Sequence, residues 1–408
     1  MLFGGGMLRM AFGPLQEAVK LDLGLTDFQI SLVQGMATGL PIALFALPVA
    51  WITDHGNRVR LLIVLLAICV TGTLWTAFSH NFTSLFFARM LASLGVTCAI
   101  TVAMSLTADL CPPQRRGRAL VVLAVGAIAG TAAGYVLGGL LVAALQKHPI
   151  WPLGQLQPWR EIHLLMSVVG ALLLLPLLAM REPQRHEVEK LNPALGTTLR
   201  ALWGKRRFLM PLFAAQVGVT MADTAATIWA APVLIRDFHL EPAQFAGMMG
   251  GAILIGGLLG SVLGGFSADW GQKSGRSGGI LSGAIIAACI CIPTALYPLM
   301  PSVNGFMVML SLLLLSGTVI NLVGSTAITV LIPNEERGLC MAAFGMINAV
   351  IGLSLAPTIV TLGSAAMGGE QHLAMSLAIT GAVTGVVSLV GYILAAKNAP
   401  KISVSKAT

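Results

Sequence analysis

Long apolar runs, separated by short segments rich in charge, glycine or proline, follow one another along the whole chain. A helix needs about 20 apolar residues to cross the hydrocarbon core of a bilayer. The runs predict twelve transmembrane helices, at residues 1–18, 28–53, 59–78, 82–108, 117–145, 161–180, 208–234, 243–268, 279–299, 303–331, 338–363 and 371–396. Runs such as 61–70 lack the alternation of barrel strands, so we predict an all-α polytopic membrane protein.

The segment at residues 181–207 is the most polar break in this pattern, with Pro183, Pro193 and seven cations. It divides the predicted helices into two sets of six. We therefore predict two bundles joined by a linker: a six-helix bundle at 1–180, a cytoplasmic linker at 181–207, a second six-helix bundle at 208–396 and a cytoplasmic tail at 397–408.

Short sequence motifs repeat in equivalent loops of the two halves, and the first two matches lie 215 residues apart, as Asp54 and Asp269 illustrate. The clearest match is Thr53-Asp54-His55-Gly56-Asn57-Arg58 with Ala268-Asp269-Trp270-Gly271, and Leu25 to Gln29 likewise resembles Leu240 to Gln244. A third match, after the fourth and tenth helices, joins Pro112 to Gly117 with Ile332 to Gly338. Duplicated bundles with a site at their interface are typical of secondary transporters, because rocking of the halves exposes the site alternately.

Composition and charge agree with a membrane protein and predict its orientation. Hydrophobic residues make up 56% of the chain and charged residues 10%, whereas about a quarter of a soluble domain is charged. With the N-terminus inside, eighteen cations lie on the cytoplasmic side, and only Lys20, Lys147, Arg160 and Arg236 lie outside. This bias predicts both termini in the cytoplasm, in a bacterial inner membrane, and it assigns the net charge of +8 to topology rather than to nucleic-acid binding.

Several stretches resemble the major facilitator superfamily, whose signature between helices two and three combines glycines, an acid and arginines. Asp54, Gly56 and Arg58 match it loosely, without its first glycine or the basic residue after the acid. Within the superfamily the chain is similar to the spinster-type branch, on stretches 47–58, 88–95, 109–116, 229–236 and 352–357. That branch carries an Asp before the helix-one arginine and a Glu after the helix-four glycine, where this chain has Leu8 and Val96.

The resemblance implies a twelve-helix fold with gating motifs at the cytoplasmic side. An acid at a helix end can accept hydrogen bonds from a neighbouring helix N-terminus, and arginines beyond it can reach carbonyl groups or Asp109. The candidate gating residues are Asp54, Gly56, Arg58, Asp109, Arg115 and Arg116 in the first half and Asp269, Arg276 and Arg337 in the second. The alternative is that these arginines only set topology.

Three charged residues fall well inside predicted spans, away from the span ends, where charge is expensive and marks function by default. Arg9 lies in helix one and Asp223 in helix seven, which are equivalent helices of the two halves. We hypothesise that the two face each other across the site, pair when it is empty and separate when substrate or a proton binds. The alternative is a static ion pair. Arg89, in helix four, either controls protonation of an acid or bonds backbone carbonyl groups.

Five further residues are candidates for the wall of the substrate cavity. They are Gln34, Gln216, Trp229, Asn321 and Asn348. A polar side chain in a span can equally bond a neighbouring helix, a contact worth about 0.6 kcal/mol on average. Glycines at a spacing of four, Gly126, Gly130, Gly134 and Gly138, predict close helix packing on one face of helix five, and a glycine-rich stretch in helix eight does the same.

The motifs of an enzyme or an ATP-driven pump are missing from the sequence. It has no Gly-x-x-x-x-Gly-Lys-Ser/Thr, no nucleophile set at one depth and no cysteines at metal-site spacing, so no cofactor is indicated. We predict a monomeric secondary transporter, or permease, that moves a small organic solute, anionic or amphipathic, through the bilayer by alternating access. Protons are the candidate coupling ion. The alternative function is a non-transporting membrane sensor with the same fold.

Overall fold

The computed structural model describes residues 1–112, 115–148, 156–184, 195–276 and 278–400. Every regular element in these residues is a helix. The first part contains α1 (Leu2–Met10), η1 (Gly13–Leu15), α2 (Gln16–Leu23), α3 (Asp27–Ser31), η2 (Leu32–Met36), α4 (Ala37–His55), α5 (Arg58–Ala77), α6 (Phe82–Leu110), α7 (Arg116–Lys147) and α8 (Pro158–Leu178).

The remaining helices follow the predicted linker or lie in it. They are α9 (Leu195–Gly204), α10 (Arg206–Arg236), α11 (Pro242–Lys273), η4 (Gly279–Leu281), α12 (Ser282–Thr294), η5 (Tyr297–Leu299), α13 (Val303–Leu331), α14 (Asn334–Ile347), η6 (Asn348–Leu353), α15 (Ser354–Ala366), η7 (Glu370–His372) and α16 (Leu373–Lys397). Helix α9 falls inside the predicted linker, of which residues 185–194 lie outside the described residues, as do 401–408 of the predicted tail.

Eleven helical segments of the described chain are long and apolar enough to cross a membrane. They coincide with the second to twelfth predicted spans to within a few residues; the span predicted at 303–331, for example, is Val303–Leu331. The prediction of an all-α polytopic membrane protein is confirmed. The chain is a multi-pass membrane protein.

The first predicted span is helical but broken. Gly13 and Pro14 open a short 3₁₀ turn between α1 and α2, because proline lacks the N–H that a continuing α-helix would use. The helical path then runs on to Leu23, past the predicted end at residue 18, and stops at Gly24, whose φ of 60° is the left-handed conformation that favours glycine. Neither α1 nor α2 alone has the length of a span.

The described residues group into two compact units. Unit 1 comprises Met1–Val188, Thr227–Leu254 and Leu353–Leu373, and unit 2 comprises Glu189–Ala226, Ile255–Gly352 and Ala374–Thr408. Unit 1 thus joins the predicted first bundle to two segments of the predicted second bundle. The domain boundaries predicted from the polar segment at 181–207 stay a prediction.

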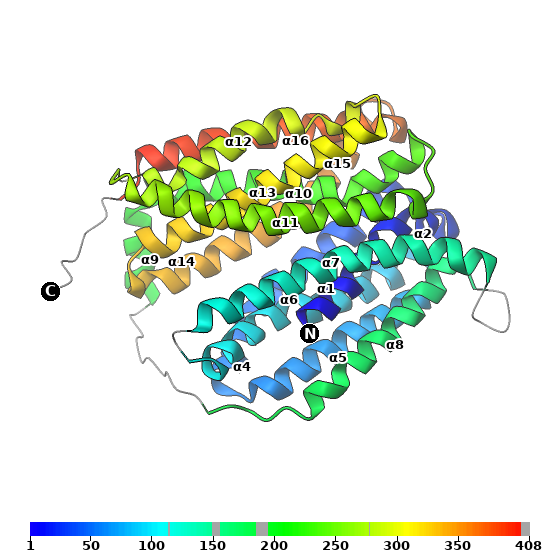
Figure 1. Cartoon of the computed structure of the whole chain (residues 1–408), viewed down its shortest axis with the longest axis horizontal. Helices are drawn as coiled ribbons and strands as arrows, with labels where there is room; N and C mark the ends of the chain where they lie inside the picture. The colour runs from blue at the N-terminus through cyan, green and yellow to red at the C-terminus, as the bar shows by residue number, and fades with distance from the viewer. Residues whose placement is uncertain (113–114, 149–155, 185–194, 277, 401–408) are drawn as a thin grey trace. The chain divides into compact units, whose positions relative to one another are not determined.

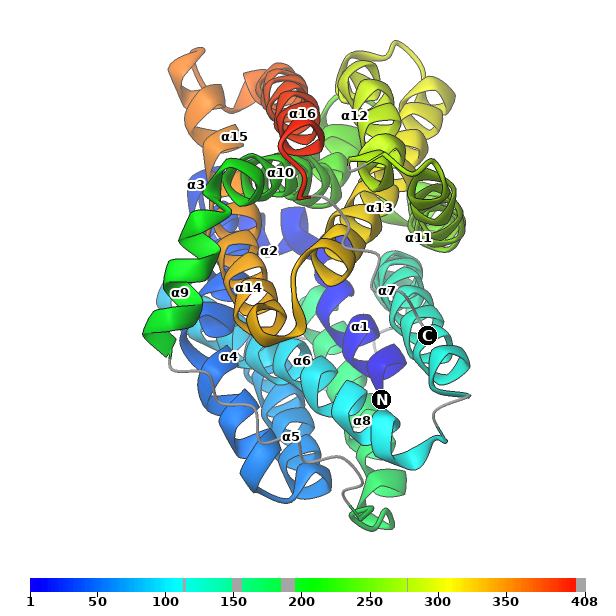
Figure 2. The ribbon, with the colours of Figure 1, turned by 90° about the vertical axis from the view of Figure 1, so that its left-hand side faces the viewer.

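In unit 1 the broken first helix lies among longer ones. Helix α1 contacts α6, α7 and α8, while α5 packs between α6 and α8 (Figures 1 and 2). The glycine seam of α7 permits the close approach, because a Cβ at Gly134 would lie only 2.7 Å from the Met7 Cα and one at Gly138 would meet the Ala11 carbonyl group. The predicted close packing of these glycines is confirmed, except at Gly126, where the neighbouring space is open.

One of the sequence repeats has a local structural cause in unit 1. The Thr26 N–H donates to the Gln29 side-chain oxygen at 3.0 Å, and the Glu241 N–H donates to the Gln244 side-chain oxygen at 2.8 Å. Both glutamines therefore cap the N-terminus of a helix, α3 in one case and α11 in the other. The capped start of α3 places Asp27 in its first turn.

Unit 2 has an apolar core between α10, α12, α13 and α16. Leu212 and Ala215 of α10, Ala288 of α12, Ile320 of α13 and Ala395 of α16 are all completely buried. The glycines of α11 pack against α13, since a Cβ at Gly260 would lie 2.7 Å from that of Thr318. Close packing predicted for this glycine-rich helix is thus confirmed at that position.

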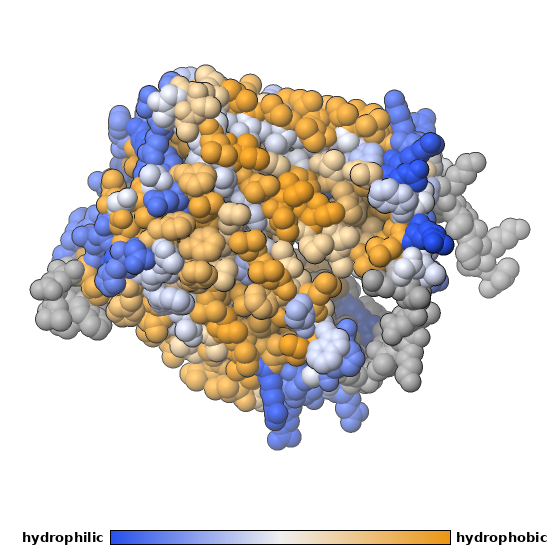
Figure 3. Space-filling view, turned by 180° about the vertical axis from the view of Figure 1, so that it is seen from behind, coloured by the Kyte–Doolittle hydropathy of each residue, from blue (hydrophilic) through white to orange (hydrophobic). Residues whose placement is uncertain are grey.

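The outer surface carries the apolar residues that a bilayer requires. Large side chains such as Val122 and Phe266 are exposed by 70% and 71%, which is unfavourable in water and favourable in lipid. In Figure 3 hydrophobic residues cover the broad middle of the face, and hydrophilic residues gather toward its margins.

Candidate functional site

A network of ion pairs in unit 1 joins residues that are far apart in the sequence. The Arg236 guanidinium, at the end of α10, donates to both carboxylate oxygens of Glu17 at 2.6 and 3.2 Å. It also donates to both oxygens of Asp27, each at 2.7 Å. Two bidentate carboxylates on one guanidinium give strong and geometrically defined contacts.

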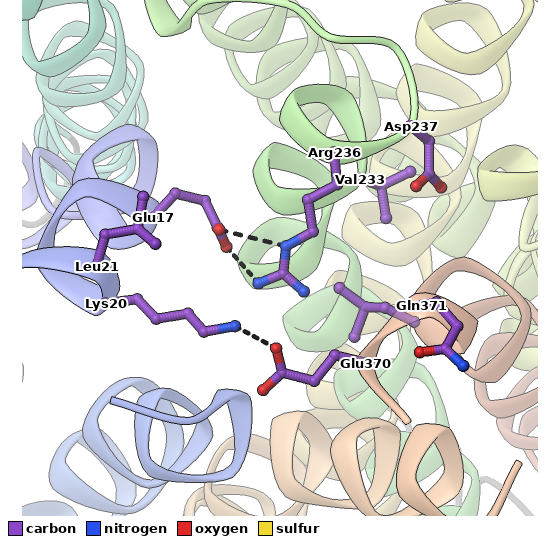
Figure 4. A pocket seen from close by; sticks show the side chains of 9 residues that line it. Glu17, Lys20, Leu21, Val233, Arg236, Asp237, Glu370 and Gln371 are labelled. Atoms are coloured by element: carbon purple, nitrogen blue, oxygen red, sulfur yellow. Dashed lines mark hydrogen bonds and ion pairs between the residues drawn. The ribbon is translucent and has the colours of Figure 1, made fainter. Parts of the chain in front are cut away.

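Lys20 and Glu370 complete this network, which we call the Arg236 cluster (Glu17, Lys20, Asp27, Arg236 and Glu370). The Lys20 ammonium pairs with Asp27 at 2.7 Å and with Glu370, and the Glu370 carboxylate also accepts from the Asp27 N–H at 2.9 Å. Figure 4 shows Glu17 and Lys20 reaching across to Arg236 and Glu370. Helices α2, α3 and α10 and the turn η7 are thereby held together.

Four members of the cluster line a cavity of about 440 Å³, to which Asp237 and Gln371 also contribute; they are Glu17, Lys20, Arg236 and Glu370. Asp237 follows the last residue of α10, outside the membrane span. Partial burial raises the pKa of its carboxyl group, although the positive charge of Arg236 opposes this shift. Glu370 is half exposed, whereas the Asp27 side chain is 5% exposed, so the network runs from the solvent side into the protein.

A second group of charges involves the predicted gating residue Arg58. Its guanidinium, 2% exposed, pairs with Asp109 and donates from Nε to Glu182 at 2.8 Å. Glu182 also accepts from the Val59 N–H at 2.9 Å and so binds the N-terminus of α5. We call Arg58, Asp109 and Glu182 the Arg58 cluster; Glu182 was not among the predicted residues.

The other predicted gating residues of the first half lie at the ends of α4 and α7. Asp54 is exposed in the last turn of α4, and Gly56 ends that helix through its N–H bond to the Ile52 carbonyl group at 2.7 Å. Arg115 is the N-cap residue of α7. Arg116 donates from Nε to the Cys111 carbonyl oxygen at 3.4 Å.

The second copy of the motif is arranged differently from the first. Asp269 and Arg276 are exposed, and Arg337 donates to the Ile332 carbonyl oxygen at 3.3 Å. The ion pair near this position joins Lys205 to Glu336. Repeated sequence therefore coincides with different charge contacts, and the gating role of both copies stays a prediction.

Arg9 and Arg89 are brought together in unit 1. Arg89 is 2% exposed and donates from Nη2 to the Arg9 carbonyl oxygen at 3.1 Å. That carbonyl group lies in the last turn of α1, where regular helical partners are missing. The Phe12 ring, 4.6 Å from the Arg89 guanidinium carbon, covers one face of the cation.

A chain of polar side chains crosses unit 2. Gln216, 1% exposed, donates to Asn321 and accepts from the Tyr392 hydroxyl at 2.8 Å. Asn321 donates to the Gly317 carbonyl oxygen at 2.9 Å, and a Cβ at Gly317 would lie 3.2 Å from the Asp223 carboxylate. Gln216, Asn321 and Asp223 therefore share one region between α10 and α13.

The remaining predicted cavity residues bond to neighbouring helices within their own units. Asn348 accepts from Thr220 at 3.0 Å, Gln34 donates to Gln16 at 2.8 Å, and the buried Trp229 donates to the Pro357 carbonyl oxygen at 3.2 Å. Gln34 and Asn348 both lie in π-helical segments, η2 and η6, which often mark functional sites.

Comparison with known proteins gives a family and several relatives. The model of the Major Facilitator Superfamily matches residues 1–357. An MFS-type efflux pump of Mycolicibacterium smegmatis is 24% identical over 93% of this chain and 87% of its own length. The 3-(3-hydroxy-phenyl)propionate transporter of Escherichia coli is 26% identical over 61% of this chain and 59% of its own.

A solved structure extends this similarity to the fold. The crystal structure of a bacterial homologue of the human lysosomal transporter Spinster, inward-facing and unoccupied, matches with a TM-score of 0.82. The two sequences are 20% identical, and the match covers 98% of this chain and 95% of the homologue's chain. The predicted resemblance to spinster-type proteins is thus confirmed for the fold. Because the family model spans most of the sequence, the chain belongs to the Major Facilitator Superfamily of membrane transporters.

Proposed function

We propose that the protein is a secondary transporter that moves a small, partly apolar organic solute across a bacterial cytoplasmic membrane by alternating access. Two relatives are named as an MFS-type efflux pump and as a transporter of 3-(3-hydroxy-phenyl)propionate. The predicted orientation, with both termini in the cytoplasm, places the Arg236 cluster at the outer face and the Arg58 cluster at the inner face.

The Arg236 cluster is the observation that carries alternating access. Glu17, Lys20 and Asp27 belong to the predicted first half, whereas Arg236 and Glu370 belong to the second. Ion pairs between the halves hold this end closed in the present conformation. For the solute to reach the outer face these pairs must part, and their partial exposure limits the cost because water can replace each partner.

The Arg58 cluster forms part of the proposed gate at the inner face. Its contacts lie within the predicted first half, between α5, the end of α6 and Glu182. It thus fixes the angle at which α5 begins rather than joining the halves directly. We infer that Asp54, Arg115 and Arg116 and the second-half residues Asp269, Arg276 and Arg337 complete this inner gate in the alternate conformation.

The substrate is bound, in this proposal, between the polar residues of the two halves. Arg9 and Arg89 contribute positive charge from the first half, and Asp223 contributes a carboxylate beside Gln216 and Asn321 from the second. We expect Arg9 and Asp223 to pair in a conformation of the empty transporter other than the present one, in which the Arg9 side chain has no ion pair within the described residues, and to separate when substrate binds. Gln34, Trp229 and Asn348 line the same path, and protons are the candidate coupling ion through Asp223.

Flux through purified protein in proteoliposomes tests the function. The probes are 3-phenylpropionate, octanoate, glucose and ethidium, each with and without an imposed pH gradient. We expect at least one to cross faster than in protein-free liposomes, and to do so saturably. Saturable binding of a probe with no flux of any probe under any gradient favours the sensor and contradicts the proposal.

A further inference from the structure

The Arg89 guanidinium has hydrogen-bonding capacity that the described structure leaves unused. Its Nε and Nη1 atoms are both buried, and neither has a partner within the described residues. Only Nη2 is satisfied, by the Arg9 carbonyl oxygen. A buried donor without an acceptor costs about 1–3 kcal/mol, and more when it is charged, so such an arrangement indicates a missing ligand.

A second guanidinium adds to this charge. The positive charge of Arg9 lies close enough to Arg89 to interact with it electrostatically. Within the described residues the Arg9 side chain makes no hydrogen bond or ion pair, and it is partly exposed. Two like charges in a region of low dielectric repel each other, and each also carries a desolvation cost. An anion beside both guanidinium groups would offset these costs.

The surrounding residues do not supply that anion. Leu8 and Val96, the positions next to Arg9 and Gly95, are apolar and buried, at 2% and 8% exposure. A Cβ at Gly5 would lie 3.2 Å from a Val96 methyl group, so Val96 fills the space against α1. Phe12 contacts the Arg89 guanidinium with the face of its ring and carries no negative charge.

The other groups that interact with Arg89 are a thiol and an imidazole ring, neither of which is a carboxylate. The Cys69 thiol is one electrostatic neighbour, and the His163 ring is another. His163 bonds through Nδ1 to the Trp159 carbonyl oxygen at 2.7 Å, and its buried Nε2 atom has no partner within the described residues. The ring thus provides a further polar atom beside the arginines, without a negative charge.

From these contacts we propose that Arg9 and Arg89 form an anion-binding subsite, and that the solute group it binds is a carboxylate. A carboxylate can accept from one of the two free Arg89 donor atoms through one oxygen and from the guanidinium of Arg9 through the other. The apolar wall of Leu8, Phe12 and Val96 favours a monoanion with an apolar body over the more strongly hydrated phosphate. The inference rests on the proposed transport function, of which it names the substrate class.

Binding to the purified full-length protein tests the subsite without requiring flux. The probes are 3-phenylpropionate and octanoate, each compared with its neutral amide, and inorganic phosphate. We expect at least one acid to bind saturably by calorimetry at millimolar concentration or below, and about tenfold or more tighter than its amide. Equal binding of acid and amide, binding of phosphate in preference to the acids, or no binding of either acid overturns the proposal.

Two variants distinguish an effect of charge on acid binding from a loss of folding. Arg9→Gln breaks no hydrogen bond or ion pair of the described structure, so it should fold and should weaken acid binding about tenfold while leaving amide binding unchanged. Ser93→Asp places a carboxylate one helical turn from Arg89 and should abolish acid binding by occupying the subsite. Arg60→Gln, which removes an exposed cation of α5, is the matched control. Unchanged acid binding in both subsite variants contradicts the proposal.

The flux assay then tests the transport function and the carboxylate subsite separately. If glucose or ethidium crosses while neither acid binds, the transport function stands and the carboxylate subsite fails. If an acid binds through Arg9 but no probe crosses, the subsite stands and the transport function fails.

Discussion

Individual polar residues make specific hydrogen bonds between the helices of this apolar protein. Gln216 illustrates this, because its buried amide group binds both Asn321 and the Tyr392 hydroxyl. In a membrane-spanning region water is not available to replace lost partners. A residue that satisfies two neighbours therefore contributes to stability whether or not it also contacts substrate.

Replacing Gln216 with leucine should destabilise the protein. The change removes a partner from Asn321 and from Tyr392, and we expect a loss of about 1–2 kcal/mol. Thermal unfolding of the detergent-solubilised protein measures this. The control is Gln272→Leu, at an exposed position, which should leave the unfolding temperature nearly unchanged. Equal stability of the two variants would contradict the network.

The charges at Arg9 and Asp223 should matter for flux rather than for folding. Asp223→Asn and Arg9→Gln each remove one partner of the proposed pair, and we expect each to lower the flux of a transported probe by about tenfold or more. Asp223→Asn should also remove any dependence of flux on a pH gradient. Glu241→Gln, an exposed acid, is the control. Unchanged transport by both variants refutes the pair.

Some of these candidate site residues could be predicted from the sequence and others could not, for a physical reason. Arg9, Arg89 and Asp223 stand out because charge inside an apolar run is rare. Glu17, Lys20 and Glu370 lie at the ends of spans, where charged residues are ordinary. Only the folded chain shows that Asp27 and Glu370, 343 residues apart, are hydrogen-bonded.

At the scale of helices, hydropathy determines most of what the structure shows. Eleven spans follow the apolar runs closely, because lipid requires long helices with satisfied backbones. The break at Pro14 was not predicted, since an apolar run continues through it. The π-helical segments η2 and η6 were also not predicted, because they depend on tertiary packing.

The seam between α7 and α1 gives a prediction at this scale. Gly134→Ala should destabilise the protein by about 1–3 kcal/mol, because the new Cβ would overlap the Met7 backbone, which cannot move aside as a flexible side chain does. Gly126→Ala is the matched control, since nothing lies within 4 Å of its Cβ position. Thermal unfolding compares the two. A destabilisation by Gly126→Ala equal to that of Gly134→Ala would contradict the packing explanation, because helix propensity alone favours alanine over glycine.

For the whole molecule, the Arg236 cluster sets the balance between conformations. Arg236→Gln leaves Glu17 and Asp27 as neighbouring carboxylates, which repel each other. We expect the equilibrium to shift by about 1–3 kcal/mol toward the outward-open state. A cysteine placed at Gln34 should then react faster with a membrane-impermeant thiol reagent added from outside.

The control for this shift lies at the same end of the molecule. Arg160 pairs with Asp22 at 3.0 Å, and both belong to the predicted first half. Arg160→Gln should therefore not speed the labelling, because its pair does not join the halves. Equal acceleration in both variants would mean that loss of stability, rather than opening of the gate, exposes the cysteine.

Cross-linking of the Arg236 cluster tests alternating access most directly. Cysteines replace Glu17 and Arg236 in protein whose two unburied native thiols, Cys111 and Cys289, have been changed to alanine. A short, reducible bifunctional thiol reagent then joins them, and the same reagent joins cysteines at Asp22 and Arg160 as a control. We predict that flux of a transported probe stops in the Glu17–Arg236 link and returns on reduction, while the control retains it. Full flux through the linked protein would contradict the account.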